Sequence, residues 1–265
     1  MKAKISKLLR QTRLLYLTDK LRFLIAKIKN NKKNVAFLMT HPNFKFPTDY
    51  LMYESFGMSY EGYYKSGIMA ASEFIDELKQ YKTIDDVKIL DWGCGPARVV
   101  RHIPEIVPSN CEIFATDYNE NSINWNKENI KDVKFNLNGI EAKLPYNDSF
   151  FDFIYGISIF THLSEKLHYD WKSELTRILK RDGILLLTLQ CELFKAILTE
   201  SEIKQFELGN LVVRGNVKEG HRTYSAFQPD SFVKKLFSDF DILKHTPSYM
   251  NNGSLEQDVW VLRKK

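Results

Sequence analysis

The sequence predicts an α/β protein with a doubly wound, mostly parallel sheet of seven strands. From residue 87 onward, short apolar segments alternate with segments of helical periodicity, which is typical of repeated β-α-β units. The chain ends in two strand-like segments around an Asn-Asn-Gly turn at 251–253, which predicts an antiparallel hairpin at one edge of the sheet. Hydrophobic residues make up 44% of the 265 residues, enough for one large core.

The elements follow in chain order from these periodicities. The expected strands are 87–92, 111–117, 133–137, 151–159, 183–190, 240–247 and 258–264. The expected helices are 67–81, 97–105, 120–130 and 164–180. The last helix is marked by Ser164 at its start and by Gly183 just after its end, residue types that commonly cap helices.

The segment before the sheet differs from the rest in charge and periodicity. Residues 1–33 hold eleven Lys or Arg and one acidic residue, so their net charge is about +10, against about −5 for the remainder. Within them, apolar residues recur at helical spacing, most clearly at Leu17, Leu21, Leu24, Ile25 and Ile28. We therefore expect a basic amphipathic helical extension at 1–33, a helical and irregular cap at 34–83, and the main domain at 84–265.

Several classes of protein are disfavoured by the composition. No uncharged apolar run reaches the roughly 18 residues of a membrane-spanning helix, and the charged N-terminal segment does not resemble a secretory signal. The three cysteines are too few and too scattered for a disulfide framework or a zinc site. We expect a cytoplasmic protein without a bound metal, in which the extension contacts either the inner face of a membrane or another protein surface, a partner subunit included; nucleic acid is disfavoured.

The segment "KILDWGCGPARVV" carries the main functional signal. Asp91 ends a buried strand, and Gly93 and Gly95 form a turn whose backbone a ligand can approach closely. No Gly-Lys-Ser/Thr follows, which excludes a phosphate-binding P-loop. Ala97 and Arg98 replace the end of the dinucleotide fingerprint, so a nicotinamide cofactor is disfavoured.

"ILDWGCGPAR" resembles motif I of the class I S-adenosylmethionine-dependent methyltransferases, with Ala97 in place of the last glycine. The resemblance implies a Rossmann-like methyltransferase fold and S-adenosylmethionine as the cofactor. It places Asp91 near the amino group of the cofactor. The turn around its carboxylate and sulfur-bearing chain is assigned to Gly93, Cys94, Gly95 and Arg98.

Further positions extend the resemblance over roughly residues 60–265. Asp117 ends the second strand, where a carboxylate can accept hydrogen bonds from both ribose hydroxyls. The resemblance implies that Tyr118 packs on the adenine, that Asn138 and Gly139 hold its amino group, and that Gly156 and Ile157 line the cofactor near the sulfonium.

The resemblance also suggests residues for the acceptor side. Of the tyrosines at 60, 63 and 64 we select Tyr64 as the one that closes over the cofactor or acceptor; the alternative is an aromatic stripe in the core. His162 is a candidate base, and the alternative is a histidine that holds the cofactor loop. His221, in a polar loop, is a candidate for acceptor binding and catalysis, or a solvated surface residue.

The acceptor class follows from what the fourth strand lacks and from a subgroup resemblance. "YGIS" is neither the Asn/Asp-Pro-Pro-Tyr motif of amino-group methylation on nucleic-acid bases nor a Pro-Cys nucleophile. "FDFIYGISIFTHL", "HRTYSAFQPDSF" and "LEQDVWVLRKK" together are similar to methyltransferases of bacterial polysaccharide and glycoside biosynthesis. We expect O-methylation, or less favoured N-methylation, of a sugar, glycan precursor or small metabolite, with the cap at 34–83 contributing to the acceptor pocket. The alternative is a non-catalytic, cofactor-binding accessory protein of a glycan assembly complex near a membrane.

Overall fold

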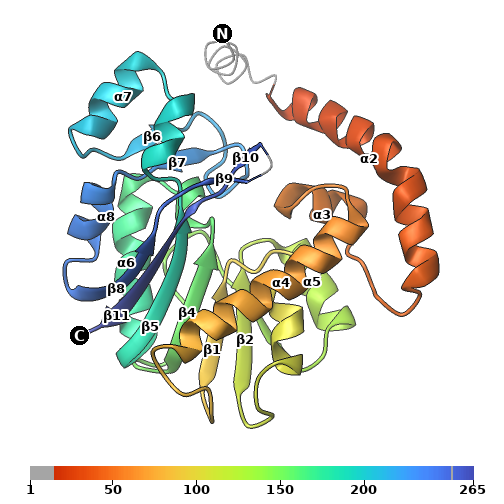
Figure 1. Ribbon diagram of the computed structural model, residues 1–265, viewed down its shortest axis with the longest axis horizontal. Coiled ribbons are helices and arrows are strands. Elements are labelled where there is room, and N and C mark those ends of the chain that lie inside the picture. The colour runs from red at the N-terminus through yellow and green to blue at the C-terminus, as the bar shows by residue number, and fades with distance from the viewer. Residues whose placement is uncertain (1–14, 252) are drawn as a thin grey trace. The chain divides into compact units, whose positions relative to one another are not determined.

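The computed structural model describes residues 15–251 and 253–265 (Figure 1). Two compact units divide the chain. The N-terminal unit spans Leu14–Leu137, and the C-terminal unit includes Asn138–Lys265.

The sheet has seven strands in the order β3-β2-β1-β4-β5-β11-β8. Pairing is parallel among β1, β2 and β3 and between β4 and β5, whereas β11 runs antiparallel to both β5 and β8. The bounds are β1 Lys88–Trp92, β2 Glu112–Asp117, β3 Lys134–Leu137, β4 Phe151–Ile157, β5 Leu179–Leu189, β8 Phe240–Thr246 and β11 Asp258–Lys264. The predicted fold class and its antiparallel C-terminal strands are confirmed.

The N-terminal unit places its helices before and between these strands. They are α2 (Leu15–Thr40), α3 (Asp49–Ser55), α4 (Tyr60–Lys79), the 3-10 helix η1 (Val100–Glu105) and α5 (Glu120–Asn129). Helix α4 packs on η1, and Gly67 makes this approach possible, because a Cβ atom there would lie 2.2 Å from the carbonyl oxygen of Arg98. Helix α2 extends beyond the boundary expected at residue 33, and residues 1–14 of the expected extension lie outside the described residues.

The helix expected at 97–105 forms only as the short η1. Ala97 has φ +59°, which is left-handed and cannot belong to a right-handed helix. Pro104 lies inside η1 and lacks the N–H group that a continuing helix would need. The expected α-helix is therefore replaced by a shorter 3-10 helix. The other expected strands and helices occur in the predicted order.

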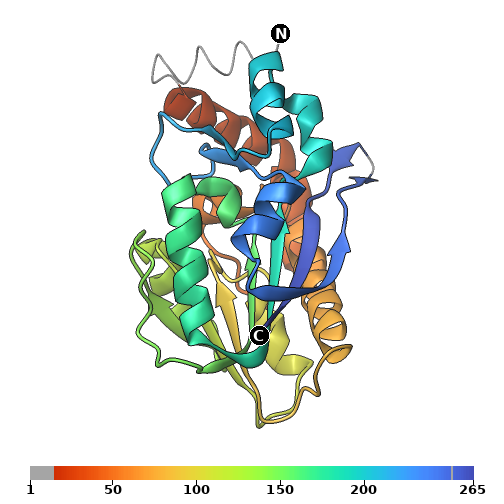
Figure 2. The ribbon, with the colours of Figure 1, turned by 90° about the vertical axis from the view of Figure 1, so that its left-hand side faces the viewer.

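The C-terminal unit covers its strands with α6. This helix spans Glu165–Ile178 and packs on β5, and Figure 2 shows it (green) along one face of the strands. The side chain of Ser164 accepts from the N–H of Leu167, which confirms the predicted cap, and β5 begins at once after the helix. The remaining elements are η2 Phe160–His162, η3 Glu192–Ile197, α7 Glu200–Glu207, β6 Val212–Arg214, β7 Ser225–Phe227, α8 Asp230–Leu236, β9 Met250–Asn251 and β10 Ser254–Leu255.

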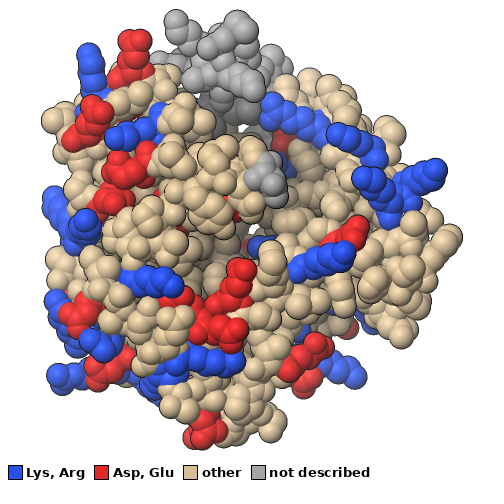
Figure 3. All heavy atoms as spheres, in the orientation of Figure 1, with Lys and Arg blue, Asp and Glu red and all other residues tan. Residues whose placement is uncertain are grey.

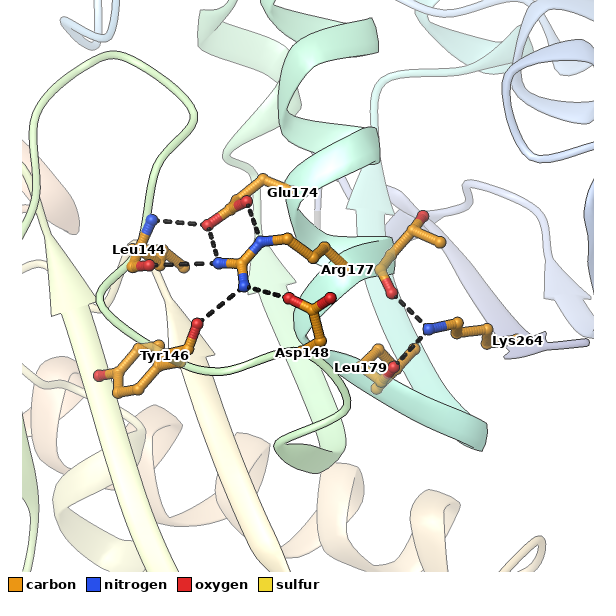
Figure 4. A network of polar contacts seen from close by, with 8 residues as sticks. Leu144, Tyr146, Asp148, Glu174, Arg177, Leu179 and Lys264 are labelled. Carbon is orange, nitrogen blue, oxygen red and sulfur yellow. Dashed lines mark hydrogen bonds and ion pairs between the residues drawn. The ribbon is translucent and has the colours of Figure 1, made fainter.

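A polar network ties the loop before β4 to α6 (Figure 4). The Arg177 guanidinium donates to both carboxylate oxygens of Glu174, to Asp148 at 2.7 Å and to the carbonyl of Tyr146 at 2.8 Å. Glu174 in turn accepts from the N–H of Leu144 at 2.6 Å. This loop begins at Asn138 and Gly139, so the network fixes the far end of the segment expected to hold the adenine.

The C-terminal hairpin is more elaborate than the sequence predicts. Strands β8 and β11 pair antiparallel as expected, but the small hairpin of β9 and β10 stands between them, with Ser254 opposite Asn251.

Among the described residues, no helix is both long enough and apolar enough to cross a membrane.

Candidate cofactor and catalytic site

The glycine turn after β1 is built from left-handed backbone. Gly93 has φ +80° and Gly95 has φ +51°, which non-glycine residues adopt only at a cost. The N–H groups of Gly93 and Cys94 both donate to the carbonyl of Thr116, at 2.8 and 3.0 Å. The turn is therefore anchored to the end of β2, and the absence of a side chain at Gly93 and Gly95 leaves its backbone accessible to a ligand.

Asp117 connects the glycine turn to the start of α5. One carboxylate oxygen accepts from the N–H of Gly95 at 2.8 Å, and the other accepts from the N–H of Asn119 at 2.7 Å. Burial raises the pKa of Asp117, and these backbone hydrogen bonds oppose the rise by favouring the charged form. A carboxylate has about four lone-pair sites, so Asp117 retains the capacity to accept from a ribose hydroxyl.

Asn126 also stabilises the glycine turn, a role that the sequence does not predict. Its amide nitrogen donates to the carbonyl of Gly95 at 2.9 Å and lies 3.8 Å from the Cys94 sulfur. Cys94 is buried, and burial raises the pKa of its thiol well above the ordinary value, so the thiol stays protonated. Cys94 therefore acts in this turn as a packed small residue and not as a nucleophile.

The donor and acceptor set of this turn fits S-adenosylmethionine. Asp91 is a buried acidic residue at the end of β1, suited to the cofactor's ammonium group. Asp117 supplies acceptors for hydroxyls, and the turn offers backbone without side chains. The turn lacks the Gly-Lys-Ser/Thr sequence of a phosphate-binding P-loop.

Arg98 and Tyr63 lie around the same turn. The Arg98 guanidinium lies 5.1 Å from the centre of the Phe56 ring and donates to Ser66 at 3.1 Å. The buried Tyr63 donates its hydroxyl to the carbonyl of Pro96 at 2.7 Å. The tyrosine that touches the glycine turn is thus Tyr63, whereas we had selected Tyr64.

Tyr64 points to a different part of the unit. Its ring packs against Phe44 at 4.8 Å, His41 at 5.1 Å and Phe37 at 5.7 Å, in an aromatic cluster next to α2. One residue of helix rotates a side chain by about 100°, which separates the two neighbouring tyrosines. The placement of Tyr64 supports the alternative of an aromatic stripe. Tyr118, directly after Asp117, is half-buried at the end of β2, where its predicted role stays untested.

In the C-terminal unit, the predicted adenine residues lie in the loop after β3, and the predicted sulfonium residues lie at the end of β4. The Asn138 amide donates to the carbonyl of Gly139 at 2.6 Å, and a Cβ atom at Gly139 would lie 2.4 Å from a Glu141 oxygen. Gly156 is buried near the end of β4, and Ile157 is half-buried as its last residue. These positions follow carboxyl ends of parallel strands, which is where open α/β sheets bind ligands.

A polar network after β4 was missed from the sequence. Ser158 has φ +62°, and its N–H donates to the Thr188 hydroxyl at 2.8 Å. Gln257 joins both residues, because it donates to the Ser158 hydroxyl and accepts from the Thr188 hydroxyl, each at 2.7 Å. Gln257 therefore holds the post-β4 turn in its strained conformation. The sequence offers one signal for this network, because Ser158, Thr188 and Gln257 are polar residues at or next to the ends of three strands.

His162 follows this turn with one ring nitrogen already engaged. Its Nδ1 lies 2.8 Å from the carbonyl of Tyr224, which accepts only from an N–H and so assigns the proton to Nδ1. Nε2 is then the acceptor. Burial lowers the pKa of His162, and electrostatic interaction with the nearby His221 and Arg222 lowers it further, while the Tyr224 hydrogen bond opposes the shift. The imidazole is therefore neutral at pH 7.

The loop that carries His221 is attached to the same segment. The N–H of Gly220 donates to the carbonyl of His162 at 2.9 Å, and Glu219 accepts from the N–H of Ser164. The Nδ1 of His221 accepts from the N–H of Thr223 at 3.2 Å. The structure thus brings together the two predicted catalytic histidines, which are 59 residues apart in the chain.

Comparisons with known proteins agree with this architecture. Residues 89–183 match the family model described as a methyltransferase domain. An S-adenosylmethionine-dependent methyltransferase from Methanosarcina mazei superposes with a TM-score of 0.55 at 17% identity, covering 71% of this chain and 96% of that one. The PH0226 protein of Pyrococcus horikoshii gives 0.55 at 19%, covering 76% and 91%.

A third similar structure is that of a cyclase. The [4+2]-cyclase SpnF superposes with a TM-score of 0.50 at 16% identity, covering 74% of this chain and 81% of that one. At these identities the superpositions show the fold alone. Together, the comparisons show a Rossmann-like methyltransferase fold in which residues 89–183 match a methyltransferase domain, and S-adenosylmethionine is the cofactor implied by that match.

Proposed function

We propose that this protein transfers a methyl group from S-adenosylmethionine to a hydroxyl group of a sugar, glycan precursor or small metabolite, with His162 as the general base. The observation that carries this proposal is the geometry of His162. Its Nδ1 is held by the Tyr224 carbonyl at 2.8 Å, and its pKa is lowered by burial. A neutral imidazole with a free acceptor nitrogen is the group that hydroxyl methylation needs.

The bound cofactor supplies a methyl group activated by its sulfonium. The acceptor oxygen attacks the methyl carbon in line with the carbon–sulfur bond, whose electron pair stays on sulfur as the bond breaks. The hydroxyl proton passes to Nε2 of His162. The Tyr224 carbonyl then stabilises the imidazolium, because it continues to accept from Nδ1.

The loop from Glu219 to Tyr224 is proposed to contribute to acceptor recognition. Its hydrogen bonds to the backbone of His162 and Ser164 fix it beside the base, and His221 and Arg222 add polar and positive groups. These groups suit a hydroxylated or acidic acceptor. The resemblance of three segments to enzymes of bacterial polysaccharide and glycoside biosynthesis supports a glycan precursor as the acceptor class.

The experiment combines cofactor binding with methyl transfer. Wild type and His162→Ala are incubated with methyl-labelled S-adenosylmethionine and a fractionated extract of small metabolites and glycan precursors, and the labelled product is identified. We expect His162→Ala to lower transfer by about 10²-fold or more, while calorimetry gives a nearly unchanged Kd for the cofactor. An equal loss of transfer and cofactor affinity would assign His162 to cofactor binding instead.

The acidic limb of the activity provides a second readout. Because the pKa of His162 lies below the ordinary value of 6.5, the base stays neutral down to lower pH than a free imidazole does. We therefore expect kcat/KM to fall only below about pH 6.5. A limb at or above the ordinary value would contradict the role of His162 as the base.

The second candidate is a cofactor-binding accessory protein without methyl transfer. The observation that favours it is the long, largely exposed α2, an element that suits attachment to another surface more than catalysis. Such a protein would bind S-adenosylmethionine in calorimetry and transfer no label to any fraction.

A further inference from the structure

Helix α2 is attached to the N-terminal unit by one side only. Near its start, Asp19 accepts from the Tyr53 hydroxyl at 3.1 Å. Further along, the buried Asn34 donates to the carbonyl of Met58 at 2.8 Å and accepts from the N–H of Tyr60 at 3.0 Å. Positions 19 and 34 differ by about 60° around a helix of 3.6 residues per turn, so these hydrogen bonds fix which side of α2 faces the unit.

The opposite side of α2 is an exposed aliphatic stripe. We define the α2 stripe by its seven members, with their exposed fractions: Leu17 (67%), Leu21 (57%), Leu24 (53%), Ile25 (56%), Ile28 (77%), Val35 (43%) and Met39 (76%). At 100° per residue they fall within an arc of about 100° centred roughly opposite Asn30, and the stripe is about 33 Å long. Scattered exposed aliphatics are ordinary, but these seven align along one helix. The exposed Lys32 lies in the same arc, between Ile28 and Val35, and divides the stripe into a longer N-terminal part and a shorter C-terminal part.

Basic side chains flank the stripe on both sides. Lys20 and Lys27 lie on one flank, and Arg22, Lys29 and Lys33 lie on the other, by the same angular arithmetic. Figure 3 shows Lys and Arg side chains along α2 at the upper right. The only acidic residue of the helix belongs to the packed side, so the exposed side presents aliphatic and positive groups together.

The charge pattern decides what can cover this stripe. Two copies of the stripe packed together would bring two basic flanks side by side, which is unfavourable even though Lys27 pairs with Asp49 of α3 at 2.8 Å. A bilayer with anionic headgroups offers negative charge at the level of the flanks and acyl chains at the level of the stripe. We propose that α2 binds the surface of anionic membranes, lying in the plane of the interface. This inference is independent of the methyl acceptor.

The test is flotation of the full chain with two kinds of vesicle, one of phosphatidylcholine alone and one of phosphatidylcholine mixed with phosphatidylglycerol. We expect binding to the mixed vesicles, weakened about tenfold or more in the absence of the anionic lipid or at high salt. The variant Leu21→Glu/Ile28→Glu should lose this binding. Both side chains are more than half exposed, so the melting temperature should stay close to that of wild type.

A matched control introduces the same charge elsewhere. Met69→Glu changes a 58% exposed residue of α4 in the same unit and should leave vesicle binding unchanged. Light scattering measures the oligomeric state and so tests the alternative, in which a second copy of the chain covers the α2 stripe. A wild-type oligomer that Leu21→Glu/Ile28→Glu converts to monomer would overturn the proposal in favour of a second copy, as would vesicle binding that the double variant retains or that never occurs.

Discussion

Replacing Asp117 with asparagine tests the central role of this carboxylate in the cofactor site. Asp117 accepts from two backbone N–H groups, at 2.8 Å from Gly95 and 2.7 Å from Asn119. An asparagine has one oxygen and one amino group, so one of these N–H groups would face another donor. The charge that strengthens the remaining hydrogen bond also disappears.

The magnitude follows from the bonds that are lost. A hydrogen bond to a charged group contributes about 1.5–3 kcal/mol, so Asp117→Asn should lower the free energy of unfolding by about 2 kcal/mol. The loss of one ribose acceptor should weaken binding of S-adenosylmethionine by about 10- to 100-fold, with a similar loss for the demethylated product, because both contain the same ribose.

Calorimetry with both ligands and urea unfolding measure these two effects. Glu120→Gln is the matched control, since it removes an exposed carboxylate three residues away, in the first turn of α5, and should leave the Kd within about twofold. If Asp117→Asn bound both ligands with wild-type affinity, the assignment of the ribose site to the end of β2 would be refuted.

Three further substitutions test the packing and the polar networks. Gly67→Ala should lower the free energy of unfolding in urea by about 2–3 kcal/mol, since its Cβ would meet the Arg98 carbonyl at 2.2 Å; a more stable variant, as helix propensity alone favours, would contradict this packing. His168 is buried and has a pKa of about 4, so the unfolded chain binds more protons between pH 6.5 and 4 and stability falls as the pH falls through that range. This contribution is at most about 3 kcal/mol, and His168→Gln should flatten the pH dependence of the melting temperature, whereas an unchanged slope would argue against a neutral buried imidazole. Gln257→Ala should release the Ser158 turn and lower methyl transfer about tenfold with a melting temperature reduced by a few degrees; full activity would show that the turn holds itself.

The strands could be predicted because their signal is local. Most of the seven are apolar segments bounded by turn residues, and parallel pairing follows from the helices between them. Asp91, the glycine turn and Asp117 were identifiable for the same reason, since their spacing is set by one β-α-β unit. The helix expected at 97–105 was not, because the left-handed backbone at Ala97 depends on hydrogen bonds that only the folded turn makes.

The parts of the site that were missed depend on contacts between distant segments. Gln257 reaches Ser158 across 99 residues, and no local pattern indicates that pairing. Tyr63 and Tyr64 are adjacent residues of the same type, so the sequence does not distinguish them. The orientation of α4 about its own axis decides which of the two contacts the glycine turn. The tautomer of His162 is set by a carbonyl 62 residues later.

The contacts of α4 connect α2 to the glycine turn of the cofactor site. Asn34 joins α2 to the first residue of α4, and Tyr63 joins α4 to the carbonyl of Pro96 in the glycine turn. Two hydrogen bonds thus separate a surface helix from the cofactor turn. By thermodynamic reciprocity, if vesicles change the affinity for S-adenosylmethionine by some factor, the cofactor changes the affinity for vesicles by the same factor. A single titration in each direction would measure this coupling, and two unequal factors would show that one titration had not reached equilibrium.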